Sequence, residues 1–430
     1  MPQQWCPGLG ASLAQGASPP ILAPIDSGST AWMLVSSALV LLMVPGLALF
    51  YGGMVRRKNV LTTMLHSFVA MAIIGVQWVV IGYALAFGAS WHGIFGWSWE
   101  SVGLQGIAPD KLYGNKGVPE LLFVMFQGKF AIITPALIAG AVAERISFRA
   151  YIAFILLWTT FIYCPLAHWV WAEGGWLFKW GVLDFAGGTV VHVASGFSAL
   201  ALVLLVGNRR DYPDGAIMPN SLVLTLTGAG LLWFGWFGFN AGSAVAVETP
   251  VAGATAALAF TTTQTAAASA ALVWMMLEWR HTGKPTSLGI ASGIVAGLVA
   301  ITPAAGHVKP LSAIAIGALG SLVCYFAVQL KARHRKDDSL DAFGVHGVGG
   351  FAGAILTGVF CFTPVKGLVF GEASQLLKQL AGAGVAAAFA FFGTLVIGSM
   401  IKATIGLRVT DQQERDGLDI SIHGERGYHL

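Results

Sequence analysis

The stretch DFAGGTVVHVASG, residues 184–196, places His192 in a run of small and apolar residues. A second stretch, DAFGVHGVGG at 341–350, does the same with His346. Ionisable groups at membrane depth are costly and usually face a protein interior or a conduction path. Imidazole also exchanges protons near neutral pH. The two stretches therefore predict a route through a membrane for a small, polar and protonatable solute.

Composition places the chain among helical membrane proteins. Of its 430 residues, 56% are hydrophobic and 10% are charged, whereas soluble domains carry roughly 25% charged residues. A spanning helix needs about 20 mostly apolar residues, and the sequence lacks the period-2 alternation of a membrane barrel. We therefore predict an all-α polytopic membrane protein. The uncharged, Pro- and Gly-rich start predicts a mobile extracytoplasmic leader over residues 1–30, with a processed remnant as the alternative.

Hydropathy predicts eleven transmembrane helices in a membrane domain over residues 31–407. The expected spans are 31–53, 61–88, 119–142, 150–171, 184–207, 220–242, 251–277, 286–304, 310–330, 341–361 and 384–407. Basic residues cluster at every second junction, for example at 56–58 and 209–210. The positive-inside rule makes these junctions cytoplasmic. The predicted N-terminus is then outside, and residues 408–430 form a cytoplasmic tail.

The first five spans and the next five are predicted to form an inverted repeat, followed by one final helix. Each set holds an odd number of spans, so the two sets run in opposite directions. Asp184 precedes His192 in the fifth span, and Asp341 precedes His346 in the tenth. At a rise of 1.5 Å per residue, His192 lies about 12 Å and His346 about 7.5 Å deeper than its aspartate. The imidazoles should meet near mid-membrane, where such repeats place transport sites; separate structural hydrogen bonds are the alternative.

Aromatic residues supply a second clue. They gather with one serine at the outer ends of three predicted spans: Phe126 and Phe130, Trp171, and Trp236, Phe239 and Ser243. A belt of aromatic residues at the membrane interface would explain any one of them. Together they predict a mouth that attracts cations, because a ring face binds a cation with roughly 0.5–2 kcal/mol.

Motifs of other function classes are missing from the sequence. No phosphate-binding GxxxxGK[ST] and no serine or cysteine nucleophile motif is present. The cysteines at 6, 164, 324 and 361 have no metal-ligand spacing. We therefore expect neither an enzyme nor an ATP-driven pump, no metal, no cofactor and no nucleic-acid partner.

Seven stretches together closely resemble the ammonium transporter family (Amt/Mep, related to Rh proteins), in its bacterial Amt form. They are PGLALFYGG, FQGKFA, AVAERI, LDFAGGTVVH, WFGWFGFNAGS, DAFGVHGVGG and GLRVTDQQERDGLDISIHGE. The resemblance runs from Asp26 to Tyr428 in the family's order. It implies a homotrimer in the inner (plasma) membrane with one pore per protomer. It also implies a tail that couples subunits and a PII-type signalling protein docking at the cytoplasmic face.

The resemblance also implies roles for individual residues. The outer ammonium site would comprise Trp171, Ser243 and Phe130, with Asp184 as its support. The gate would be Phe130 and Phe239, the pore lining His192, His346 and Trp236, and the supporting residues Phe126 and Asp341. Members of this type recruit NH4+ (or methylammonium as an analogue), deprotonate it, and conduct NH3 with or without a relayed proton. A dry pore excludes potassium, which cannot shed a proton.

Two departures and two rivals complete the sequence-based view. Lys129 lies beside the gate residue Phe130, where we expect it to snorkel to the outer surface. The loop after Trp171 is one residue longer than expected. An Rh-like channel for NH3 or CO2 is the first rival, and the cation-recruiting pair Trp171 and Ser243 argues against it. An ammonium sensor is the second; sensors carry an output domain, which residues 409–430 are too short to form.

Overall fold

The computed structural model describes residues 25–114, 116–214 and 217–428. Cys6 and residues 1–24 of the predicted leader lie outside the described residues. The longer helices are α1 (Ser27–Met54), α2 (Val60–Gln77), α4 (Glu120–Ala139), α5 (Phe148–Trp158), α8 (Ala194–Val206), α9 (Leu222–Gly242), α10 (Pro250–Thr282), α11 (Ser287–Ile301), α12 (Pro310–Arg333), α13 (Val348–Phe360) and α14 (Ala373–Thr404). The chain is therefore mainly helical, as predicted.

Shorter elements join these helices. They are α3 (Tyr83–Phe87), α6 (Cys164–Trp171), α7 (Trp176–Trp180), α15 (Asp411–Asp416), α16 (Leu418–His423), the 3-10 turns η1 (Arg57–Asn59), η3 (Trp99–Leu104), η4 (Gly140–Val142) and η8 (Leu368–Phe370), and the π-helical turns η2 (Trp78–Gly82), η5 (Thr159–Tyr163), η6 (Gly188–Val193) and η7 (Phe343–Gly347). Strands β1 (Ser90–Trp91) and β2 (Phe95–Gly96) pair as an antiparallel hairpin.

Ten helical segments of the described chain are long and apolar enough to cross a membrane. The eighth predicted span corresponds to α11, which is apolar but shorter than these ten. The last span was predicted to begin at 384, yet α14 begins at Ala373. Its first two turns hold Gln375 and Gln379, which bond to the backbone of Gly181 and Leu183. Hydropathy missed this part because the helix is polar where it meets another element.

Side chains of the sequence set where several helices begin. Asp26 accepts a hydrogen bond from Ser29 N at 2.6 Å before α1. Ser221, Thr249 and Thr286 accept in the same way before α9, α10 and α11. Each such cap satisfies one of the N–H groups that the first helical turn leaves free. The polar residues between the apolar runs therefore act as helix starts.

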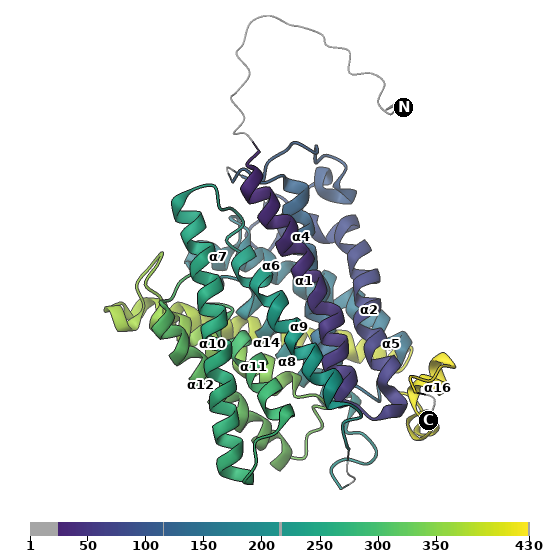
Figure 1. The fold of residues 1–430 in the computed structure, drawn as a ribbon. Coiled ribbons are helices and arrows are strands. Elements are labelled where there is room, and N and C mark those ends of the chain that lie inside the picture. The colour runs from purple at the N-terminus through teal and green to yellow at the C-terminus, as the bar shows by residue number, and fades with distance from the viewer. Residues whose placement is uncertain (1–24, 115, 215–216, 429–430) are drawn as a thin grey trace, which may run out of the picture.

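The helices pack together as one bundle (Figure 1). Helices α1 and α9 lie side by side, and α10 packs against both α11 and α12. Turns η6 and η7 touch each other, while α8 packs on η7 and α13 on η6. The equivalent parts of the two predicted repeats therefore cross at the centre of the bundle.

Charged residues of four predicted cytoplasmic junctions meet at one end of the bundle. Glu144 accepts from Arg56 at 3.1 Å and from Arg209 at 2.8 Å. Arg209 also bonds to Asp337 at 2.8 Å, and Arg145 donates to the Asp337 carbonyl. Burial raises the pKa of Glu144, but Arg209 and Arg56 outweigh it and hold that pKa below its ordinary value. These four predicted basic junctions are thus on the same side of the molecule.

The C-terminal tail folds back onto this end of the bundle (Figure 1). Asp419 of α16 accepts from the backbone N–H groups of Leu61 and Thr62 at 3.0 and 2.8 Å, and so caps α2. Glu414 of α15 pairs with Arg408 at 2.7 Å. The tail is therefore an ordered, docked part of the chain.

Candidate functional site

The two histidines lie side by side where the repeats cross. His192 is part of η6 and His346 part of η7, and only 1% and 4% of their surfaces are exposed. Their Nδ1 atoms are 3.2 Å apart. The ring centroids are 5.2 Å apart, with the planes inclined by 16°. The sequence thus predicted the meeting of the rings, but not the π-helical turns that carry them, which frequently mark functional sites.

Glycines allow the backbones to approach this closely. A Cβ atom on Gly196 would lie 2.1 Å from the Cα atom of Gly347. A Cβ atom on Gly350 would lie 2.8 Å from the Cβ atom of His192. Any larger residue at Gly196 or Gly350 would force the two turns apart, and with them the imidazoles.

The Nδ1–Nδ1 contact fixes how two neutral imidazoles hold their protons. A neutral ring carries one proton, so one Nδ1 donates and the other accepts. The donor ring then has a bare Nε2 atom, while the acceptor ring carries its proton on Nε2. Nε2 of His192 is buried without a hydrogen-bond partner in the described part of the chain. The pair can therefore offer one acceptor and one donor to a small guest.

Asp184 caps the turn that carries His192. Its carboxylate accepts four backbone N–H groups, those of Gly187, Gly188, Thr189 and Val190, at 2.6–3.0 Å. A carboxylate is well suited to the positive end of a helix. The side chain is fully engaged in these bonds, so it shapes the site through η6.

The counterpart of Asp184 in the second repeat is Asp338, and not Asp341 as predicted. Asp338 accepts from the N–H groups of Ala342, Phe343 and Gly344 at the start of η7. Asp341 is bonded to Lys331 of α12 instead. The signal was present in the sequence, since Asp184 precedes His192 by eight residues and Asp338 precedes His346 by the same number. Asp341 lies nearer to the conspicuous glycine stretch, so the pattern pointed to Asp341 instead.

Two phenylalanine rings stack on each other close to His192. Phe130 of α4 and Phe239 of α9 stack with centroids 4.2 Å apart and planes inclined by 26°. Phe126, one turn earlier on α4, meets Phe130 edge-on at 4.9 Å. Both stacked rings are fully buried. Rings in contact leave no opening between them.

Trp171 and Ser243 lie beside this stack. The indole of Trp171 meets Phe130 edge-on, with centroids 5.9 Å apart, and its Nε1 donates to the Asp184 carbonyl at 2.9 Å. This bond ties the longer loop after Trp171 to the start of η6. Ser243 Oγ donates to the Phe239 carbonyl at 2.8 Å. The hydroxyl proton of Ser243 is therefore engaged in this hydrogen bond, and the lone pairs of its oxygen can still accept a hydrogen bond from a donor.

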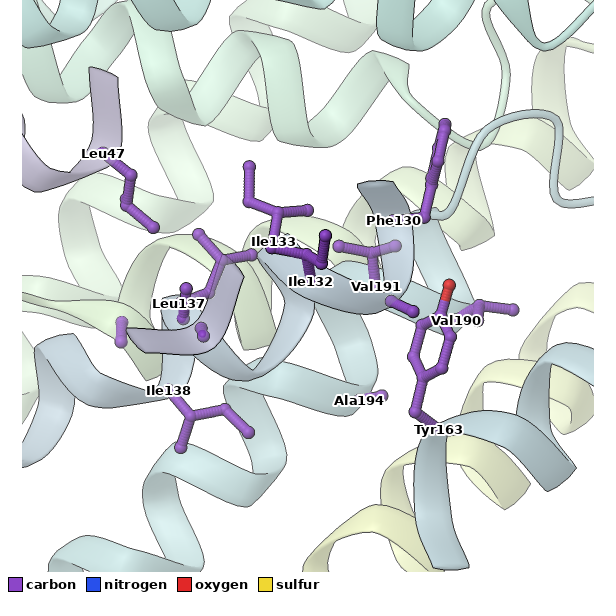
Figure 2. Packing of buried hydrophobic residues seen from close by; sticks show 14 of the residues in the cluster. Leu47, Phe130, Ile132, Ile133, Leu137, Ile138, Tyr163, Val190, Val191 and Ala194 are labelled. Carbon is purple, nitrogen blue, oxygen red and sulfur yellow. The ribbon is translucent and has the colours of Figure 1, made fainter. Parts of the chain in front are cut away.

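A small, mainly apolar cavity lies below the stacked rings. It is lined by Met43, Leu47, Phe50, Ile133, Leu137, Val191, His192, Leu232, Trp236, Phe239, Val295 and His346. Its volume of about 10 Å³ has room for roughly one water-sized molecule. Figure 2 shows Ile133 and Leu137 of α4 beside Val191 of η6 in this packing. Among these lining residues, the polar side-chain groups free to meet such a guest are those of the two histidines.

In the described residues, neither Lys129 nor a metal site contributes to this arrangement. The described residues give Lys129 no hydrogen bond and no ion pair, and it takes no part in the ring stack beside it. Within the described ranges, no group of three His, Cys, Asp or Glu side chains is placed to hold a metal ion.

A family model described as the Ammonium Transporter Family matches residues 31–428. The chain belongs to the ammonium transporter family. It is 48% identical to an ammonium transporter of Aquifex aeolicus over 95% of both chains. It is 46% identical to one of Bacillus subtilis, over 94% of this chain and 99% of that protein. The resemblance stated from the sequence is thereby confirmed.

Solved structures of this family share the fold. Saccharomyces cerevisiae Mep2 matches with a TM-score of 0.82 and 37% identity, over 90% of this chain and 91% of that one. A structure described as a Sensor Amt Protein matches with a TM-score of 0.84 and 30% identity, over 92% and 98%. With its ten long apolar helices, this member of the ammonium transporter family is a multi-pass membrane protein.

Proposed function

We propose that the chain recruits NH4+ at an outer site, deprotonates it, and conducts NH3 through a pore lined by His192 and His346. The observation that carries this proposal is the order of the groups along one path. A ring stack of Phe130 and Phe239 covers a cavity of about one water's size, and the histidine pair forms part of its wall. Cation-binding groups lie on one side of the stack, and groups suited to a neutral guest on the other.

The outer site suits a cation with several N–H donors. Ser243 presents lone pairs, because its proton is donated to Phe239. Trp171 and Phe130 present aromatic rings, and a ring face attracts a cation by roughly 0.5–2 kcal/mol. Asp184 acts through Trp171 and η6, to which its own groups are bonded. Phe126 supports the position of Phe130.

The cavity below suits ammonia better than ammonium. An unpaired ion in an apolar enclosure loses hydration worth many kcal/mol, while a neutral amine needs only one or two hydrogen bonds. The Nε2 atoms of the pair supply one donor and one acceptor, and NH3 can use both. Potassium is similar in size to NH4+ but has no proton to release, so this route excludes it. Trp236 completes the wall beside His192, and Asp338 supports the turn that carries His346.

The proposal extends to topology and assembly. Ten long apolar helices plus α11 give eleven spans, with the N-terminus outside, the tail at 408–430 inside, and the transporter domain at 31–407. Exposed apolar side chains such as Val223, Val251 and Leu311 suit contact with lipid or with other protomers of a homotrimer. The docked tail offers a cytoplasmic surface to a PII-type protein. A bacterial Amt of this kind belongs in the inner membrane.

An ammonium sensor is the second candidate, favoured by the 30% identity to the Sensor Amt Protein. A sensor binds ammonium at the outer site without net flux, and an Rh-like channel passes gas without saturable recruitment. Ammonium pulses on reconstituted protein, recorded on a solid-supported membrane together with methylammonium uptake, separate the three. We expect saturable uptake. Binding without uptake supports the sensor, and non-saturable flux supports the gas channel.

A further inference from the structure

The indole of Trp236 lies beside the His192 ring in the cavity wall. Only 2% of the residue is exposed, and it lines the cavity below the gate. Its ring is nearly parallel to the His192 imidazole, with centroids 5.4 Å apart and planes inclined by 19°. An indole has one polar group, its Nε1–H, which is a donor only. The direction of this N–H group therefore decides whether the part of the cavity wall formed by Trp236 is apolar.

Thr302 holds that N–H outside the cavity. Its Oγ1 atom accepts from Trp236 Nε1 at 2.9 Å. The threonine is fully buried just after α11, and its own hydroxyl proton is donated to the Leu298 carbonyl at 2.7 Å. The lone pairs of Oγ1 are thereby turned toward the indole. Thr302 does not line the cavity itself, so it acts on the pore through Trp236.

Loss of this acceptor has a defined consequence. A buried N–H without a partner is costly and turns toward any acceptor within reach. The unpartnered Nε2 atom of His192 belongs to the same cavity. An indole N–H turned inward would compete with the guest for it, or would bind the lone pair of NH3 and hold it. It would also end the parallel stacking that orients the His192 ring.

We propose that Thr302 is a positioning residue for transport, which keeps the Trp236 ring flat against His192 and its N–H out of the pore. This inference rests on the proposed function, because the pore is taken to carry NH3. Thr302 controls the passage of ammonia below the gate and leaves the recruitment of ammonium above it untouched. The expected signature is a fall in maximal flux at an unchanged apparent KM.

The test uses full-length protein in liposomes and methylammonium uptake. Thr302→Val removes the acceptor at nearly constant volume, and Thr302→Ser restores a hydroxyl. Thr357→Val is the matched control, since that buried hydroxyl donates to the Gly353 carbonyl at 2.8 Å and lies outside the cavity lining. We expect Thr302→Val to lower maximal uptake about tenfold with KM within twofold, and Thr302→Ser and Thr357→Val to stay near wild type.

The same substitution made in a Trp236→Phe protein separates loss of the Trp236–Thr302 hydrogen bond from a folding defect. Trp236→Phe removes the N–H itself, so Thr302→Val added to Trp236→Phe should lower maximal uptake no further. Wild-type flux in Thr302→Val would overturn the inference, as would an equal fall in Thr302→Ser or a further fall in the double variant. If wild-type protein shows no ammonium or methylammonium uptake at all, the proposed function fails, which is a separate result.

Discussion

Asp338 and Asp184 make the same connection to the two turns that carry the paired histidines. Each carboxylate accepts the first backbone N–H groups of a π-helical turn, and each precedes its histidine by eight residues. The two imidazoles are thus supported in the same way, each by a carboxylate at the start of its own turn. Asp341, by contrast, is held by Lys331 of α12.

Replacing Asp338 by Asn should disturb the pore more than replacing Asp341 by Asn. Asp338→Asn weakens charge-assisted bonds to three N–H groups, each worth about 1.5–3 kcal/mol, and lets η7 and His346 shift. Asp341→Asn weakens a partly exposed ion pair worth about 0–1 kcal/mol. Thermal unfolding in detergent and methylammonium uptake would measure both variants. A larger loss in Asp341→Asn would return the supporting role to that residue.

His192→Ala should abolish uptake or open the pore to other cations. The substitution leaves Nδ1 of His346 without its partner at 3.2 Å and creates space that water can enter beside it. A wetter pore no longer requires deprotonation, so selectivity for ammonium over potassium should fall. Currents recorded with ammonium and with potassium would measure the selectivity, and methylammonium uptake would measure transport. Unchanged uptake together with unchanged selectivity would rule out the role of the histidine pair.

Trp171→Leu should weaken recruitment without slowing passage through the pore. The leucine removes one ring next to Phe130 and the indole bond to the Asp184 carbonyl. A cation–π contribution of about 0.5–2 kcal/mol corresponds to a rise of roughly 2- to 30-fold in apparent KM. Uptake by Trp171→Leu and uptake by wild type, measured across substrate concentrations, should reach the same maximal rate at saturation. No change in apparent KM would remove Trp171 from the outer site.

Sequence patterns predicted the helices and most of the site because both rest on local composition. Apolar runs located ten long helices and the shorter α11, and odd numbers of spans per repeat brought His192 and His346 together. The start of α14 at Ala373 was missed because Gln375 and Gln379 are polar and buried by a partner element. Thr302 was missed because a lone buried hydroxyl has no sequence signal. Its role exists only through contact with Trp236, 66 residues away.

Glu144→Gln should destabilise the cytoplasmic end of the bundle in a pH-dependent way. Arg209 and Arg56 overcome the effect of burial and lower the pKa of Glu144. A carboxyl group with a lowered pKa adds stability above its ordinary pKa of 4.5, and that stability is lost as pH falls through the lowered value. Removing one partner of a buried ion pair costs about 3–5 kcal/mol.

Unfolding in detergent should therefore show a large difference in stability between Glu144→Gln and wild type at pH 7. The difference should become progressively smaller as the pH is taken well below 4.5. Asp211→Asn is the matched control: Asp211 also bonds to Arg56, but it is half exposed, so only a small difference in stability is expected. An equal difference between Glu144→Gln and wild type at every pH would show that the carboxylate charge is not what stabilises this end.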